Sequence, residues 1–167
     1  FFEQMGGEDK AGSGPFIREG AVGPGTLIEQ LFPGQSKVIA TVICGDNYFA
    51  ERKDRANQEV FNLIKDYAMD IFIAGPAFNA GRYGIACGEI RKYVKEKTGV
   101  PAITGMFPEN PGVELYKRHV YIIEITGNAA GMRQAMSKML SLALKLYRGQ
   151  PIGRSEEEGY IPQGVKK

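Results

Sequence analysis

The sequence has few of the residues that build metal centres, disulfide scaffolds or nucleic-acid surfaces. Its 167 residues include two cysteines, one histidine and no tryptophan, and the net charge at pH 7 is +2. Cys44 and Cys87 lie far apart and form no CxxC pair, which suits a reducing cytosol better than a disulfide framework. Because the net charge is small and no Lys/Arg block occurs, we expect neither nucleic acid nor a membrane as partner. No apolar stretch approaches the roughly 18 residues of a membrane-spanning helix.

Four apolar, β-branched runs are present instead, and they predict the fold. Helix-like segments separate the runs, so we expect parallel strands joined by crossover connections. This pattern predicts an α/β protein, a three-layer Rossmann-like or flavodoxin-like sandwich with a mainly parallel sheet. The runs cover residues 37–43, 70–74, 100–104 and 119–125.

The remaining periodic segments predict helices and the domain limits. Apolar residues at helical spacing occur at 24–32, 54–67, 82–97 and 132–147, with a short helix near 111–117. Pro101 indicates an edge strand or the first residue of a strand. Residues 1–23 contain no evident strand, so we expect a first strand upstream. We therefore expect an α/β domain over 1–150, with 151–167 beginning a connection to a carboxyl-terminal part outside this chain.

Loops rich in Gly, Pro, Asn and charge follow each run, at Cys44, Gly75, Gly105 and Thr126. In open α/β sheets the carboxyl ends of the strands bind ligands. We therefore expect the four loops to share one edge and to contain the functional site. No GxxxxGK[ST] phosphate loop occurs, and the glycines of residues 20–25 are most simply a permissive start to a helix.

The loop after the first run carries a thiol, a carboxylate and an amide, on Cys44, Asp46 and Asn47. These three groups are candidates for binding a small polar ligand or a partner. The alternative is that Cys44 is a small buried apolar residue and that Asp46 or Asn47 caps the next turn. Cys87 lies on the apolar face of a predicted helix, so we assign it to the core.

The loop after the second run, GPAFNAGRYG, is the most unusual stretch. Its glycines allow close approach of a ligand, and it leads into a helix amino terminus that favours an anion. Its binding candidates are Gly75, Asn79, Gly81, Arg82 and Tyr83. The alternative is a tight turn in which Asn79 is the N-cap.

Two further candidates, Glu109 and Asn110, lie in the loop after the third run. A carboxylate there suits a substrate amine, although Glu in a Pro/Gly turn is commonly exposed and idle. His119, the single histidine, is expected to open the fourth strand at the opposite edge. No Ser-His-Asp triad or metal-ligand cluster can be assembled around it, so we expect no metal site.

Six strings in order resemble one family. The sequence is similar to the amino-terminal part of the large selenoprotein subunit in component B of glycine, sarcosine or betaine reductase, over nearly all 167 residues. The strings are GGEDKA (6–11), REGAVGPG (18–25), VICGDNYF (42–49), AGPAFNAGRYGIACG (74–88), PENPGVELY (108–116) and EEGYIPQG (157–164).

The resemblance implies a cytoplasmic oxidoreductase complex of amino-acid fermentation, acting on a small amine-containing carboxylate. Implied partners are a pyruvoyl-bearing subunit of component B and a small selenoprotein, component A. The family's selenocysteine motif belongs to the carboxyl-terminal part, so neither Cys44 nor Cys87 takes that role and no catalytic residue is expected in this fragment. Two alternatives remain: a stand-alone flavodoxin-like module for a nucleotide or flavin, and a structural assembly domain.

Overall fold

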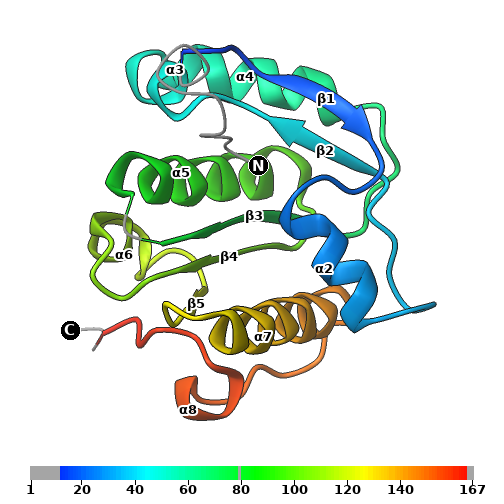
Figure 1. The fold of residues 1–167 in the computed structure, drawn as a ribbon, viewed down its shortest axis with the longest axis vertical. Coiled ribbons are helices and arrows are strands. Elements are labelled where there is room, and N and C mark those ends of the chain that lie inside the picture. Colours follow the sequence, from blue (N-terminus) through cyan, green and yellow to red (C-terminus); the bar gives the residue numbers. More distant parts are fainter. Residues whose placement is uncertain (1–11, 79, 165–167) are drawn as a thin grey trace. The chain divides into compact units, whose positions relative to one another are not determined.

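The computed structural model describes residues 12–78 and 80–164 (Figure 1). The chain divides into two compact units, Phe1–Met69 and Asp70–Lys167, and each is described by itself. No helix among the described residues is long and apolar enough to cross a membrane.

The first unit contains a two-stranded antiparallel sheet. Strand β1 (Phe16–Glu19) pairs with β2 (Ala40–Ile43) in a register that places Phe16 opposite Ile43. Two predictions were wrong here. Residues 1–23 do contain a strand, and the run at 37–43 is not part of the parallel sheet. The reason is that β1 has only two apolar residues and is mostly exposed, so its pairing with β2 leaves little trace in the pattern of the sequence.

The described part of the first unit, from residue 12 onward, also contains helices α2 (Pro24–Leu31), α3 (Asp46–Glu51) and α4 (Lys53–Ile64). Pro24 occupies the first turn of α2, where its missing N–H costs nothing. The Glu29 side chain accepts a hydrogen bond from the backbone N–H of Val38 at 2.9 Å. This contact joins α2 to the segment that leads into β2.

The second unit contains a three-stranded parallel sheet between helices. Its strands are β3 (Phe72–Ala77), β4 (Ala102–Met106) and β5 (Ile122–Glu124), in the order β3-β4-β5. Helix α5 (Gly81–Thr98) packs on β3 and β4, and α7 (Ala129–Tyr147) packs on β4 and β5 from the other side of the sheet (Figure 1). Short helices α6 (Pro111–Tyr116) and α8 (Ser155–Glu158) follow β4 and α7. The predicted α/β class with three layers is confirmed.

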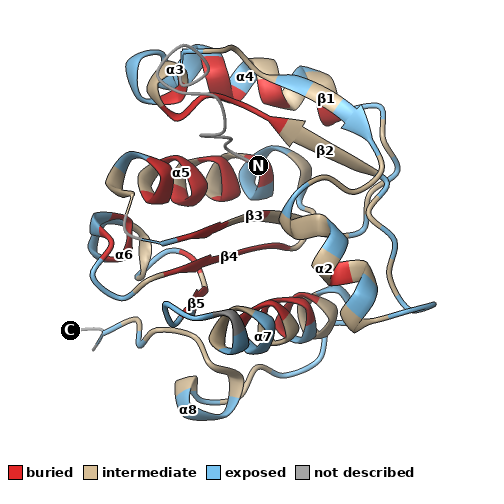
Figure 2. Cartoon of the chain, in the orientation of Figure 1, coloured by how far each residue is buried: buried red, intermediate tan, exposed pale blue. Residues whose placement is uncertain are grey.

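Strand β4 is the centre of this core. All five of its residues are buried, as expected for a strand between two helical layers (Figure 2). Pro101 immediately precedes the strand and its carbonyl accepts a hydrogen bond from Phe72 N at 2.9 Å. Of the two predictions for Pro101, the first residue of a strand is nearer to the structure than an edge strand, because β4 lies at the centre of the sheet.

The last predicted strand is shorter than its apolar run. His119 lies in a turn, because the Tyr116 carbonyl accepts hydrogen bonds from the N–H groups of His119 and Val120. The prediction that His119 opens a strand was wrong. The segment after α8 lies along β5: Glu124 N donates to Gly159 O at 3.0 Å and Ile161 N donates to Ile122 O at 2.7 Å.

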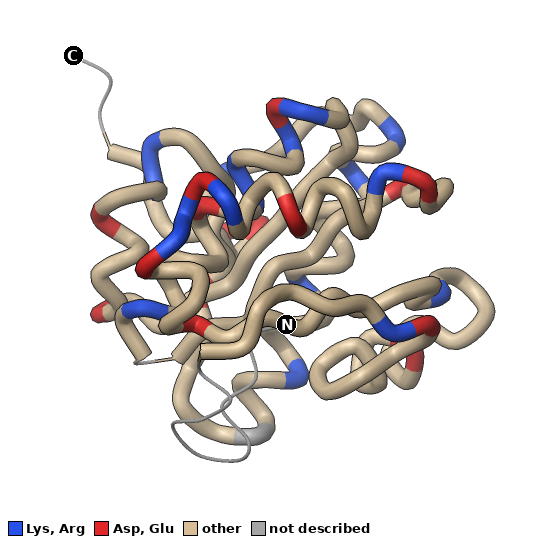
Figure 3. Tube along the Cα trace, turned by 90° about the horizontal axis from the view of Figure 1, so that it is seen from above, with Lys and Arg blue, Asp and Glu red and all other residues tan. Residues whose placement is uncertain are grey.

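Charges of both signs are interspersed along the helices (Figure 3). Several are locally paired, including Arg55 with Glu59 and Lys117 with Glu114. Such pairs between exposed side chains contribute little to stability, about 0 to 1 kcal/mol each.

Candidate functional site

The carboxyl edge of the parallel sheet gathers three of the four predicted loops. The loops after β3, β4 and β5 follow parallel neighbours and therefore leave the sheet at the same edge. The loop at Cys44 follows β2, which belongs to the antiparallel sheet of the first unit. The prediction of a single four-strand parallel edge was wrong for this loop.

Asn110 joins two of the loops at this edge. Its side chain is 2% exposed, and its amide nitrogen Nδ2 donates to Phe78 O at 2.7 Å and to Ala80 O at 3.1 Å. Its Oδ1 accepts from Gly112 N at 2.9 Å and caps α6. Both amide hydrogens are thus used within the protein. Asn110 holds the β3–α5 loop to the β4–α6 loop and is a structural residue here.

The glycines of the same region bring helices together. A Cβ atom at Gly84 would lie 2.0 Å from Asn110 Oδ1, and one at Gly88 would lie 2.3 Å from the Tyr116 ring. A Cβ at Gly81 would lie 3.0 Å from Pro111 Cγ. These three glycines face α6 and its N-cap, so they allow α6 to approach α5. For Gly81 the structure shows this packing role, and binding of a ligand by Gly81 stays a prediction.

Gly75 is required by the backbone. It lies within β3 with φ +107°, where a side chain is strained, and a Cβ would lie 3.3 Å from Gly105 O. The glycine thus serves the contact between β3 and β4. The sequence predicted that the strand would end at residue 74, whereas β3 continues to Ala77.

The other candidate residues at this edge differ in how far their side chains are buried. Arg82 is exposed in the first turn of α5, Tyr83 is 9% exposed, and Glu109 is exposed in a turn. Asn79 lies outside the described residues. The N-cap of α5 is Ala80, so the alternative in which Asn79 caps this helix was wrong.

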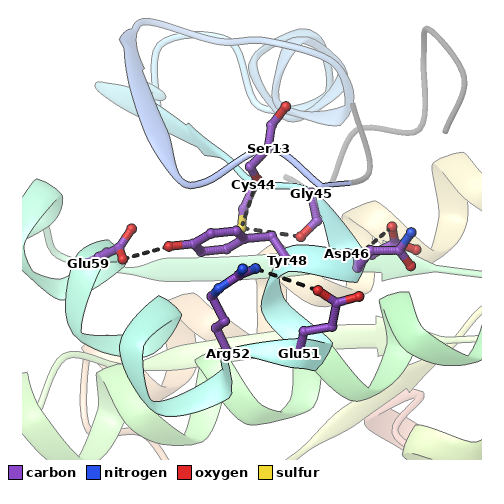
Figure 4. A network of polar contacts seen from close by, with 9 residues as sticks. Ser13, Cys44, Gly45, Asp46, Tyr48, Glu51, Arg52 and Glu59 are labelled. Carbon is purple, nitrogen blue, oxygen red and sulfur yellow. Dashed lines mark hydrogen bonds and ion pairs between the residues drawn. The ribbon is translucent and has the colours of Figure 1, made fainter. Parts of the chain in front are cut away.

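The candidates of the first unit form a separate group (Figure 4). Cys44 is 2% exposed and its thiol donates to Gly45 O at 3.4 Å. Burial raises the pKa of Cys44 to about 12, and burial likewise raises the pKa of Cys87 to about 12. Asp46 is 6% exposed, begins α3, and accepts a hydrogen bond from Asn47 N at 2.9 Å. The burial of Cys44 agrees with its interpretation as a small buried apolar residue. The suggestion that Asp46 or Asn47 caps the next turn was wrong, because the N-cap of α3 is Gly45 and no side chain caps the helix.

A polar cluster that the sequence did not indicate lies beside Cys44. Tyr48 Oη donates to Glu59 Oε1 at 2.7 Å, and Arg55 Nε donates to the same oxygen at 2.8 Å. The Arg52 guanidinium lies 5.1 Å from the Tyr48 ring centroid (Figure 4). The hydrogen bond to the Glu59 carboxylate raises the pKa of Tyr48. The spacing of four residues between Arg55 and Glu59 could be recognised in the sequence as a possible ion pair on one helix. The contact of Tyr48 with α4 could not, because it depends on the turn between α3 and α4.

Both thiols are expected to resist alkylation in the folded protein. At pH 8 they are neutral, because both pKa values stand near 12, and the thiolate is the reactive form. Iodoacetamide followed by mass spectrometry should label neither cysteine until urea is added. The pKa of each thiol is higher in the folded than in the unfolded protein. The contribution of the two thiols to the free energy of unfolding is therefore fully present below about pH 9 and is lost as the pH rises toward 12. Rapid labelling of native Cys44 at pH 8 would contradict the assignment.

A pocket of about 210 Å³ lies where β5, α7 and α8 meet, at the carboxyl end of β5. The sequence marked the loop at Thr126 as part of the functional edge. Glu156, an exposed residue of α8, also lies at the pocket. Asn128 caps α7 beside it, with Oδ1 accepting from Gly131 N at 2.7 Å. The pocket is lined by Glu124, Thr126, Gly131, Gln134, Ala135, Lys138, Ser155, Glu156, Gly159 and Tyr160.

A family model described as Glycine/sarcosine/betaine reductase selenoprotein B (GRDB) matches residues 1–167, the whole chain. The chain belongs to this family. The family resemblance inferred from the six strings is therefore confirmed.

Similar proteins within the GRDB family carry names with three different substrates. The chain is 52% identical to the glycine reductase complex component B subunit gamma of Carboxydothermus hydrogenoformans, over all of this chain and 38% of the relative. It is 48% identical to the sarcosine and to the betaine reductase complex component B subunit beta of Peptoclostridium acidaminophilum, each over 99% of this chain and 38% of the relative. The chain thus spans about two fifths of the length of these relatives. No solved structure matches it significantly.

The cysteines of this GRDB chain do not fit a redox centre. Cys44 and Cys87 are free and buried, belong to different units, and have raised pKa values. A redox pair needs an accessible group with thiolate or selenolate character. No redox step is therefore assigned to these two residues.

Proposed function

We propose that this chain is part of component B of a reductase that acts on glycine, sarcosine or betaine. In this proposal the complex cleaves the C–N bond of the substrate reductively, releases the amine and leads to acetyl phosphate. The observation that supports it most is that the whole chain matches component B subunits named for each of the three substrates. This chain contributes the substrate-handling scaffold.

The reactive groups lie on other parts of the assembly in this proposal. The resemblance implies a pyruvoyl group on the companion subunit of component B and a selenocysteine in the part of the large subunit that this chain does not cover. Component A, a small selenoprotein, receives the two-carbon fragment, and the complex acts in the cytoplasm. The buried, neutral thiols of Cys44 and Cys87 support placing the redox chemistry elsewhere.

A stand-alone flavodoxin-like module for a nucleotide or flavin is not favoured, because the relatives described above are all named as reductase components. The loop after β3, which the sequence predicted as a ligand-binding loop, also makes contacts within the protein. Asn110 and the glycines of α5 hold this β3–α5 loop against α6. Flavin absorbance in the purified protein would revive that alternative.

Reconstitution tests the proposed function. Complete component B that includes this chain, supplied with the other components and a reductant, is expected to form acetyl phosphate from at least one of the three substrates. The chain alone is expected to turn over none of them, because it holds no redox pair. Turnover of no substrate by the complete assembly would contradict the proposal, and so would reduction of glycine or betaine by the chain alone.

A further inference from the structure

The pocket between β5, α7 and α8 has the size of a small metabolite. Its volume is about 210 Å³. This is below the about 300 to 1,000 Å³ of typical ligand pockets, so a small amino acid suits the space better than a nucleotide or a flavin.

Charges of opposite sign line this pocket without neutralising one another. Lys138 lies on the α7 side, Glu124 ends β5, and Glu156 belongs to α8. Among the ion pairs that join described residues, none includes Lys138, Glu124 or Glu156. The pocket therefore presents an ammonium group and two carboxylates that take part in none of these ion pairs.

The Lys138 side chain lies across Gly159. A Cβ atom at residue 159 would be 2.6 Å from Lys138 Cδ and 3.4 Å from Nζ. Gly159 also has φ +86°, so a glycine is required there twice over. The neighbouring carboxylate of Glu158 is paired with Lys145 and does not compete for Lys138.

An aromatic ring forms another part of the wall. Tyr160 Oη donates to Gly153 O at 2.9 Å, and its ring meets Tyr121 edge to face at a centroid distance of 4.9 Å. These two contacts hold the ring in place. Aromatic faces attract cationic nitrogen, including methylated ammonium groups that donate no hydrogen bonds.

We propose that this pocket binds a small zwitterionic amino acid, with its carboxylate at Lys138 and its cationic nitrogen toward Glu124, Glu156 and the Tyr160 ring. The inference rests on the proposed function and deepens it, because glycine, sarcosine and betaine all have this charge pattern and differ only in N-methylation. A carboxylate-lined wall with an aromatic ring accepts all three forms of the nitrogen.

The test uses complete component B and the variant Lys138→Met, which keeps the length of the side chain and removes its charge. We expect the Kd of the substrate, measured by titration calorimetry, and its KM to rise about tenfold, because a charge-assisted hydrogen bond is lost. We expect kcat to change little, since Lys138 holds the carboxylate and not the reacting bond. Acetate should compete with the substrate in the wild type, and its inhibition constant should rise in parallel in Lys138→Met.

Arg133→Met is the matched control, because Arg133 is an exposed cation on the same helix that does not line the pocket. It should leave the Kd and KM unchanged. If Lys138→Met fails to assemble, Glu124→Gln provides the second variant, with weaker substrate binding and unchanged acetate inhibition expected.

The outcomes separate the two proposals. If Lys138→Met has the same Kd and KM as the wild type, the pocket assignment is overturned. The same holds for Glu124→Gln where that variant replaces Lys138→Met. Turnover by the assembly would leave the proposed function intact in either case. An assembly that turns over none of the three substrates would overturn the proposed function. In that case calorimetry with the same zwitterions still decides the pocket: binding that Lys138→Met weakens supports it, and no binding overturns it.

Discussion

Gly84→Ala is expected to lower the local stability of the α5–α6 region by about 3 kcal/mol, despite the higher helix propensity of alanine. The added Cβ would lie 2.0 Å from Asn110 Oδ1 and 2.3 Å from its Cγ. Asn110 cannot swing away cheaply, because three hydrogen bonds hold its side chain in a buried position. Native-state hydrogen exchange of the α5 and α6 amides measures the effect in the intact protein.

A double-mutant cycle with Asn110→Ala tests the cause of this loss. Asn110→Ala alone should cost about 2 to 4 kcal/mol, because it removes the side-chain partner of Phe78 O and Gly112 N and one of the two hydrogen bonds to Ala80 O. It also removes the atoms that a Cβ at residue 84 would meet. The double variant should therefore be more stable than the sum of the single losses by about 2 kcal/mol.

The control for this cycle is Gly25→Ala in α2. A Cβ there would meet its nearest atoms at 3.5 Å, an ordinary contact, so little change is expected. Additive losses in the double variant would show that Asn110 and Gly84 do not share one packing contact.

Arg91→Ala is expected to lower the stability of the parallel sheet and α5 by about 3 kcal/mol. Arg91 is 7% exposed, and its Nε donates to Ala102 O at 2.8 Å, which joins α5 to the start of β4. Burial lowers the pKa of Arg91 to about 10, so the side chain is still charged at neutral pH and its hydrogen bond is charge-assisted. Alanine leaves both a cavity and an unpaired buried carbonyl.

Lys95→Ala, one turn further along the same helix, is the control. Lys95 is exposed and its Nζ donates to Gly99 O at 3.2 Å at the surface, so its loss should change the stability by less than about 0.5 kcal/mol. Equal effects of the two substitutions on hydrogen exchange would contradict the buried role of Arg91.

Most of the second unit could be predicted, because its three strands and the helices α5, α6 and α7 each have a local signal. Alternating helical and β-branched segments predicted the parallel strands and the helices on both faces, whereas the short helix α8 was not predicted. The first unit was harder to predict. The short strand β1 has a weak pattern, and its antiparallel pairing with β2 depends on contacts that local periodicity does not contain.

The candidate site could be located from the sequence only in part. The spacing of Gly81, Gly84 and Gly88 places them on one helix face, which in this protein is the face that receives α6. The same spacing suits a ligand loop, so the sequence does not distinguish the two roles. The β5–α7–α8 pocket combines residues 124–160 from three elements, and only the fold brings Lys138 to Gly159 and Tyr160.

A crystal structure of complete component B with its substrate would locate the bound ligand. Electron density for the ligand is expected between Lys138 and Tyr160, with the carboxylate toward the ammonium group. Density beside Arg82 after β3, with the β5–α7–α8 pocket filled only by water, would contradict this expectation.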